Sequence, residues 1–100
     1  MKIIAEVTII PIGVGVSLSP YVAACEAVFR QFPLEIELHA NGTNLEGDYD
    51  DVVAAIKACH VKLHDMGAPR IATNIKLGSR TDRAQNMGDR VTSVLEKLDS

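Results

Sequence analysis

The residues best suited to chemistry lie in segments where apolar and polar side chains alternate. Glu6 is a carboxylate inside the apolar segment 2–12, and burying it without a partner would cost free energy. We therefore expect Glu6 to face Lys76, a histidine or a bound cation. Glu6, Glu37 and Glu46 could also supply an acid–base pair, provided that two of them lie close together and differ in pKa.

A histidine pair on a predicted helix has the spacing of two zinc ligands. His60 and His64 stand four residues apart, but Val61 occupies the position where a metalloprotease has its glutamate. No third ligand is evident in the sequence. The pattern therefore favours solvated or interface histidines over a metal site.

Two further motifs have a structural and a functional interpretation. Gly13-Val14-Gly15 lacks the third glycine of a dinucleotide fingerprint and the lysine of a P-loop, which favours a flexible turn. The alternative is a wall close to a ligand, to which Ser17 adds a hydroxyl. Lys76, Arg80 and Arg83 form a small basic cluster that predicts a solvated loop, with an anion or phosphate contact as the alternative.

The segment Leu34–Gly47 predicts the hairpin that would position part of this polar set. Its first arm alternates between an apolar face for burial and a polar face made of Glu35, Glu37 and His39. Asn41-Gly42 follows, and this dipeptide accepts the positive φ angles of a two-residue type I′ turn.

The other elements follow from apolar periodicity and from residues typical of helix ends. They are strands at 2–12 and 70–77, a helix that Ser19 caps and Pro33 ends, a helix that Asp48 or Asp50 caps and Gly67 ends, and a last helix with Met87, Val91, Val94, Leu95 and Leu98 aligned.

This order predicts an α+β fold, the ferredoxin-like βαββαβ sandwich, with a four-stranded antiparallel sheet and an added C-terminal helix. One domain is expected to span residues 1–100. Two helices would cover one face of the sheet. The other face would be mixed, with Ile4 and Ile10 beside Glu6, Thr8, Glu37, His39, Asn44, Glu46, Asn74 and Lys76. Such a face predicts a ligand or a partner, and homo-oligomerisation to a dimer or tetramer would cover it.

Composition narrows the classes of function. A net charge of −3 and a pI near 5.5 argue against nucleic-acid binding, which needs clustered Lys and Arg. The apolar N-terminal run is too short to span a bilayer and lacks the pattern of a signal peptide, so no membrane partner is expected.

Cys25 and Cys59 belong to no CxxC motif and are predicted to be small buried residues, which indicates a cytoplasmic protein.

Three stretches together resemble a known family: IIAEVTIIPIGVGVSLSPYV, NGTNLEGDYDDV and GAPRIATNIKLGSRTDR with NMGDRV. They are similar to the small thiamine-binding proteins, which are stand-alone domains related to the YkoF-type thiamine-binding domains. The resemblance implies a ferredoxin-like fold, homo-oligomers, and binding of thiamine or its pyrimidine moiety without catalysis. This chain departs from the family pattern at His39-Ala40-Asn41, at Asn44 and at Asn74.

The resemblance also suggests roles for the polar face. The thiazolium of thiamine is a fixed cation that Glu6 or Glu46 would meet, while amides and hydroxyls would pair with the aminopyrimidine. The expected ligand-binding residues are Glu6, Thr8, Ser17, His39, Thr43, Asn44, Glu46, Asn74 and Lys76. No catalytic residue, metal or cofactor other than a bound thiamine is expected. The alternatives are a structural oligomer without a ligand, and a small enzyme that acts through His39 and Glu46.

Overall fold

The computed structural model describes residues 1–100 and contains four strands and three helices. The predicted α+β class and the order βαββαβ with an added C-terminal helix are confirmed. The elements are β1 Lys2–Ile12, α1 Ser19–Phe29, β2 Glu35–His39, β3 Gly42–Asp48, α2 Tyr49–Asp65, β4 Arg70–Ser79 and α3 Met87–Leu98.

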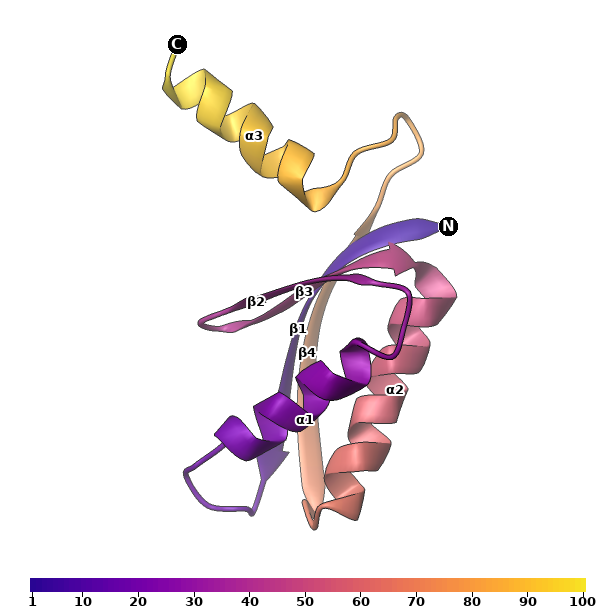
Figure 1. Ribbon diagram of the computed structural model, residues 1–100, viewed down its shortest axis with the longest axis vertical. Helices are drawn as coiled ribbons and strands as arrows, with labels where there is room; N and C mark the ends of the chain where they lie inside the picture. Colours follow the sequence, from indigo (N-terminus) through magenta and orange to yellow (C-terminus); the bar gives the residue numbers. More distant parts are fainter.

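The strands form one antiparallel sheet in the order β2-β3-β1-β4. β1 therefore lies between β3 and β4, and strands β1 and β3 form the middle of the sheet. α1 and α2 pack together on one side of the sheet (Figure 1). The opposite side of the sheet carries neither of these helices, and β2 and β4 are its two edges.

The hydrophobic core lies between the sheet and the two helices. Ile3, Ala5 and Val7 alternate along β1, and each is at most 2% exposed, because side chains at every second position of a strand share one face. The buried cluster continues through residues of β3, α1 and α2, among them Leu45, Phe29, Val52, Cys59 and Leu63.

Both cysteines belong to this core, as predicted. Cys25 and Cys59 are buried free thiols, and the Cys59 Sγ donates to the Cys25 carbonyl oxygen over 3.7 Å. The hydrogen bond to Cys25, together with burial, raises the pKa of the Cys59 thiol. Cys59 is therefore protonated at neutral pH and packs as a small apolar residue.

The predicted ends of α1 are wrong. Leu18 is the N-cap residue, with no side-chain cap, and Ser19 is already the first helical residue. At the other end, α1 stops at Phe29, before the predicted Pro33. The N–H of Phe32 donates to the carbonyl of Phe29, so the chain tightens into turns spaced by three residues. Pro33 disfavours helical geometry in Phe32, the residue before it, so the helix cannot continue through that position.

The hairpin forms, but its turn lies one residue earlier than predicted. His39 pairs with Gly42, so Ala40 and Asn41 make the turn. No residue other than glycine has a positive φ angle, which excludes a type I′ turn. Glycine suits position 42 for a steric reason, because a β-carbon there would lie 2.9 Å from the Val7 carbonyl oxygen.

Replacing Gly42 with alanine is expected to lower the free energy of unfolding by about 1–3 kcal/mol, as overpacking in a tight site does. The added carbon would meet the Val7 oxygen and, also at 2.9 Å, the Thr8 Oγ1. Chemical denaturation measures the change. Gly78→Ala is the matched control, because a β-carbon at Gly78 meets no atom within 4 Å. Equal stability of the two variants would show that β1 does not constrain the hairpin here.

The ends of α2 agree with the sequence. Asp48 is the N-cap, and its carboxylate accepts from the Asp50 N–H over 3.2 Å. Gly67 follows the last turn with a φ angle of 99°, which glycine adopts without strain.

The third helix stands apart from the other two. Asn86 and Asp89 form a capping box at its start. α3 then extends beyond the end of the sheet, away from α1 and α2 (Figure 1), and none of its residues is buried. Its aliphatic residues Val91, Val94, Leu95 and Leu98 are 53–73% exposed. No helix in the structure has the length and apolar character needed to cross a bilayer.

Candidate ligand-binding site

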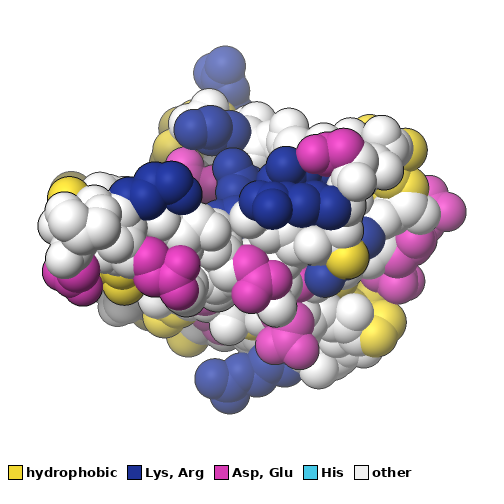
Figure 2. Space-filling model, turned by 90° about the horizontal axis from the view of Figure 1, so that it is seen from above, with side chains coloured by type: hydrophobic (Ala, Val, Ile, Leu, Met, Phe, Trp, Pro, Cys, Tyr) yellow, Lys and Arg dark blue, Asp and Glu magenta, His cyan; other side chains and the backbone are white.

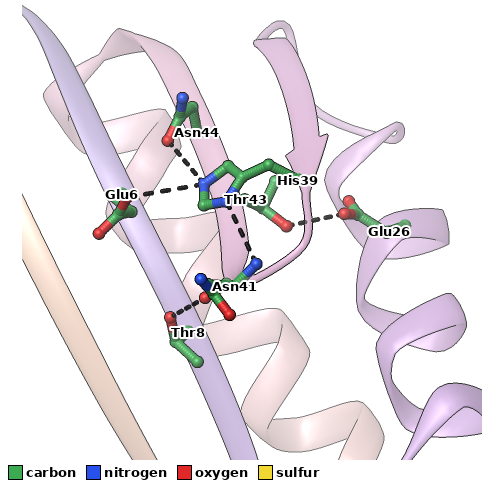
Figure 3. A network of polar contacts seen from close by, with 7 residues as sticks. All are labelled: Glu6, Thr8, Glu26, His39, Asn41, Thr43 and Asn44. Carbon is green, nitrogen blue, oxygen red and sulfur yellow. Dashed lines mark hydrogen bonds and ion pairs between the residues drawn. The ribbon is translucent and has the colours of Figure 1, made fainter.

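A polar cluster on the helix-free face joins three strands (Figure 3). The His39 Nε2 lies 3.1 Å from the Asn44 Oδ1 and 3.6 Å from the Glu6 Oε2. Both neighbours are oxygens, so Nε2 carries the proton that it donates to Asn44. On the other side of the ring, Nδ1 accepts from the Asn41 N–H over 3.4 Å. Of the partners predicted for Glu6, the structure supplies the histidine.

Strand register arranges four polar residues in one row across the whole sheet. Glu37 on β2 is opposite Asn44 on β3, Asn44 is opposite Glu6 on β1, and Glu6 is opposite Lys76 on β4. Residues directly opposite one another share a face. The row therefore has carboxylates in its β2 and β1 positions and a cation at its β4 end, with an amide between the carboxylates.

Two other predicted residues lie on the same face, one step along the strands. Thr8 is opposite Asn74 in the register. The Thr8 Oγ1 donates to the Asn41 carbonyl oxygen over 3.0 Å, so this hydroxyl fastens the hairpin turn to β1. The side chains of Asn74 and Lys76 make no hydrogen bond or ion pair within the protein, which leaves both free to meet a ligand.

A cleft of about 300 Å³ lies between this row and the start of α3, and we call it the sheet cleft. Its volume is at the lower end of the range typical of small-molecule sites. Polar groups from the row stand on its floor, and apolar side chains of the sheet and α3 supply walls. Its lining residues are Ile4, Ala5, Glu6, Glu37, Asn44, Lys76, Leu77, Gly78, Met87, Arg90 and Val91.

Glu46 shapes this cleft, although it does not line it. Its carboxylate is 5% exposed and accepts from the Met87 N–H over 2.7 Å, with the Lys2 Nζ at 2.8 Å from the other oxygen. The two donors hold the first residue of α3 over the sheet. Glu46 was expected to contact the ligand, but both of its oxygens already have partners.

Comparison with known proteins identifies the family. The model of the family described as thiamine-binding protein matches residues 5–95. The chain belongs to that family. The UPF0045 protein sll0230 of Synechocystis sp. is 50% identical over 94 residues, which cover 94% of this chain and 78% of the relative.

Solved structures of similar proteins have the same fold. The hypothetical protein MJ1052 of Methanocaldococcus jannaschii superposes with a TM-score of 0.89 at 35% identity, covering 95% of this chain and 97% of that one. TM0486 of Thermotoga maritima superposes with a TM-score of 0.80 at 13% identity, over 94% of this chain and 99% of its own. At that identity, the second comparison supports the fold alone.

Two of the residues that the resemblance marks as departures from the family pattern contact each other. His39 and Asn44 form the 3.1 Å hydrogen bond described above. Asn74, the third departure, lies on the same face opposite Thr8. These three residues thus lie together on the polar face.

The structure separates Thr43 and Ser17 from the row. Thr43 is buried on the helix-covered face, where its Oγ1 donates to the Glu26 Oε1 over 2.7 Å. The other oxygen of Glu26 is buried without a partner. Ser17 is exposed in the loop before α1 and lines none of the clefts.

Glu26 and Thr43 line a second cleft, also of about 300 Å³, which we call the α1 cleft. It lies between α1, β1 and the hairpin turn and is mostly apolar, with Leu18, Val22 and Phe29 among its lining residues. It reaches from the helix-covered side of the sheet to the hairpin turn, where Thr8 and His39 also line it.

Basic residues form a third cleft, of about 390 Å³, next to the sheet cleft, and we call it the basic cleft. Of the predicted cluster, Arg80 and Arg83 line it, whereas Lys76 lies in the sheet cleft. The hydrogen-bonded guanidinium of Arg80 lowers the pKa of Asp82 to about 2. Asp82 is therefore ionised at neutral pH and neutralises Arg80.

The histidine pair has structural partners. The His60 Nε2 lies 2.6 Å from the Thr73 Oγ1, and the His64 Nδ1 lies 2.7 Å from the Ala68 carbonyl oxygen. These contacts join α2 to β4 and to the loop before it. No group of three His, Cys, Asp or Glu side chains in the structure is arranged to hold a metal ion.

Sequence reasoning missed several residues of the clefts. Met87 and Arg90 reach the sheet cleft only because α3 starts over the sheet, and no local pattern predicts that position. Their spacing of three residues does place them on neighbouring positions of one helix face. Glu37 was assigned to the polar face but not to the site, and its place in the row depends on strand register.

Proposed function

We propose that this protein binds thiamine in the sheet cleft of a homo-oligomer and does not transform it. The observation that carries the proposal is the row Glu37–Asn44–Glu6, which lines a cleft of suitable size in a member of the thiamine-binding family. Two carboxylates flank one amide there, and Met87 and Val91 of α3 line the same cleft beside Arg90.

Charge and hydrogen bonding in the cleft suit this ligand. The thiazolium cation is attracted by Glu6 and Glu37, and partial removal from water strengthens that attraction. The Asn44 amide has donors and an acceptor, which match the ring nitrogens and the amino group of an aminopyrimidine. Ile4, Met87 and Val91 supply apolar contact for the rings.

Binding without catalysis is supported by the contacts of the two residues that an enzyme would use. His39 bonds to Asn44 and lies near Glu6, whereas Glu46 holds Lys2 and the start of α3. The two side chains have separate partners and do not form an acid–base pair. Turnover of thiamine by the purified protein would contradict this part of the proposal.

Homo-oligomerisation is supported by the apolar face of α3. A helix with Val91, Val94, Leu95 and Leu98 exposed along it is stable when another surface covers them. A second copy of the chain provides that surface. In light scattering, wild type is expected to be a dimer or tetramer and Val94→Asp/Leu95→Asp a smaller species, whereas a monomeric wild type would contradict the proposal.

Titration calorimetry and thermal unfolding with thiamine test the binding proposal. Saturable binding is expected, with a melting temperature that rises with thiamine concentration, because the ligand stabilises only the folded state. Choline, a cation without an aromatic ring, is the control for simple charge attraction. No heat and no thermal shift at millimolar thiamine would refute the proposal and favour a structural oligomer without a ligand.

A further inference from the structure

The sheet cleft and the basic cleft form one continuous surface with opposite charge at its two ends. They share Ile4, Gly78 and Arg90 as lining residues. Glu6 and Glu37 stand at the β1 and β2 side, and Lys76 and Arg90 stand toward β4 and α3. A ligand that extends from the first region into the second would meet carboxylates at one end and cations at the other.

The basic cleft is strongly cationic. It is lined by Lys2, Arg80, Arg83 and Arg90 and by no acidic residue. In Figure 2, Lys and Arg side chains gather at the end of the molecule from which α3 extends. This concentration of charge contrasts with the net charge of −3 on the whole chain.

Two of the four cations in the basic cleft have no carboxylate partner. Lys2 pairs with Glu46 at 2.8 Å, and Arg80 pairs with Asp82 through two nitrogens. Arg83 and Arg90 form no ion pair. Two guanidinium groups without partners beside a small cleft fit a phosphate, because each can donate two parallel hydrogen bonds to its oxygens.

We propose that the basic cleft binds the phosphate of a phosphorylated small molecule whose cationic ring occupies the sheet cleft. This inference rests on the proposed function, which makes a phosphate ester of thiamine the preferred ligand. Such an ester carries a positive ring and a negative phosphate at opposite ends. The joined clefts likewise present carboxylates where the ring would lie and guanidinium groups where the phosphate would lie.

Calorimetric titration of the full-length protein with thiamine, thiamine monophosphate and inorganic pyrophosphate tests the inference. Wild type is expected to bind the monophosphate about 10–100-fold more tightly than thiamine, the gain typical of hydrogen bonds to charged groups. Arg83→Gln should remove most of this preference and leave the affinity for thiamine unchanged, because Arg83 lines only the basic cleft. Raising the salt concentration should reduce the preference.

Arg70→Gln is the matched control, since Arg70 is exposed at the far end of β4 and lines no cleft. It should leave all three affinities unchanged. Equal affinity of wild type for thiamine and its monophosphate would overturn the inference and leave the proposed function intact. If thiamine fails to bind, pyrophosphate that binds wild type but not Arg83→Gln would still support the phosphate site, and pyrophosphate that binds neither would overturn it.

Discussion

The double variant Glu6→Gln/Glu37→Gln is expected to bind thiamine about 10–100-fold more weakly than wild type, the effect of losing charge-assisted contacts in a partly desolvated site. Glutamine keeps the size of the side chain and removes only the negative charge. The thiazolium would then enter the sheet cleft with Lys76 and Arg90 as its nearest charges, and both repel it. Isothermal titration calorimetry at constant ionic strength measures the change.

Glu35→Gln is the control for this prediction. Glu35 belongs to β2, two residues before Glu37, is also exposed to solvent, and lies outside the sheet cleft. It changes the net charge of the protein without changing the charge of the cleft. If the double variant kept the affinity of wild type, the carboxylates of the row would have no part in thiamine binding.

Replacing Glu46 with alanine is expected to release α3 from the sheet. The variant loses the 2.7 Å hydrogen bond from the Met87 N–H and the ion pair with Lys2. Hydrogen bonds to charged groups contribute about 1.5–3 kcal/mol, so the free energy of opening of α3 should fall by about that amount. Hydrogen exchange of residues 87–98 should accelerate, while exchange in β1 and α2 should not change.

Glu35→Ala is the control for this second prediction, because Glu35 stands opposite Glu46 in the register but forms no hydrogen bond or ion pair with Lys2 or α3. Release of α3 should also weaken thiamine binding, since Met87 and Val91 form part of the sheet cleft. Unchanged exchange in α3 would show that other contacts fix this helix. Faster exchange in every element would show that Glu46 stabilises the whole fold.

The two faces of the sheet could be predicted from the sequence, because alternation in a strand depends only on neighbouring residues. Ile3, Ala5 and Val7 proved buried, and Glu6 and Asn44 proved to lie on the face without helices. The turn was misplaced by one residue, yet the faces stayed correct. Moving a two-residue turn by one residue changes the strand pairing by two positions. Because side chains in a strand alternate with a period of two, each one stays on the same face of the sheet.

The pairs across the strands could not be predicted. A turn at Asn41-Gly42 would place His39 opposite Asn44, whereas the structure places Glu37 there. In the observed register Gly42 lies where a β-carbon would meet the Val7 carbonyl oxygen, a contact between residues far apart in the chain. Local sequence propensity associates glycine with positive φ angles. It contains no information on how closely another strand approaches that glycine.

The contacts of α3 and of Glu26 could not be predicted from sequence patterns either. Glu46 meets the Met87 N–H across 41 positions, and Thr43 meets Glu26 across 17. Such hydrogen bonds depend on how whole elements pack. The apolar stripe of α3 was predicted, but its position beyond the sheet, with the stripe exposed, was not.

Mapping of amide chemical shifts on ¹⁵N-labelled protein during a thiamine titration tests the central claim most directly. The proposal predicts saturable shifts that cluster around Glu6, Glu37, Asn44 and the first turn of α3. The helix side of the α1 cleft, around Val22, Glu26 and Phe29, should change little. Shifts that cluster in the α1 cleft, or the absence of saturable shifts, would contradict the claim that the helix-free face is the thiamine site.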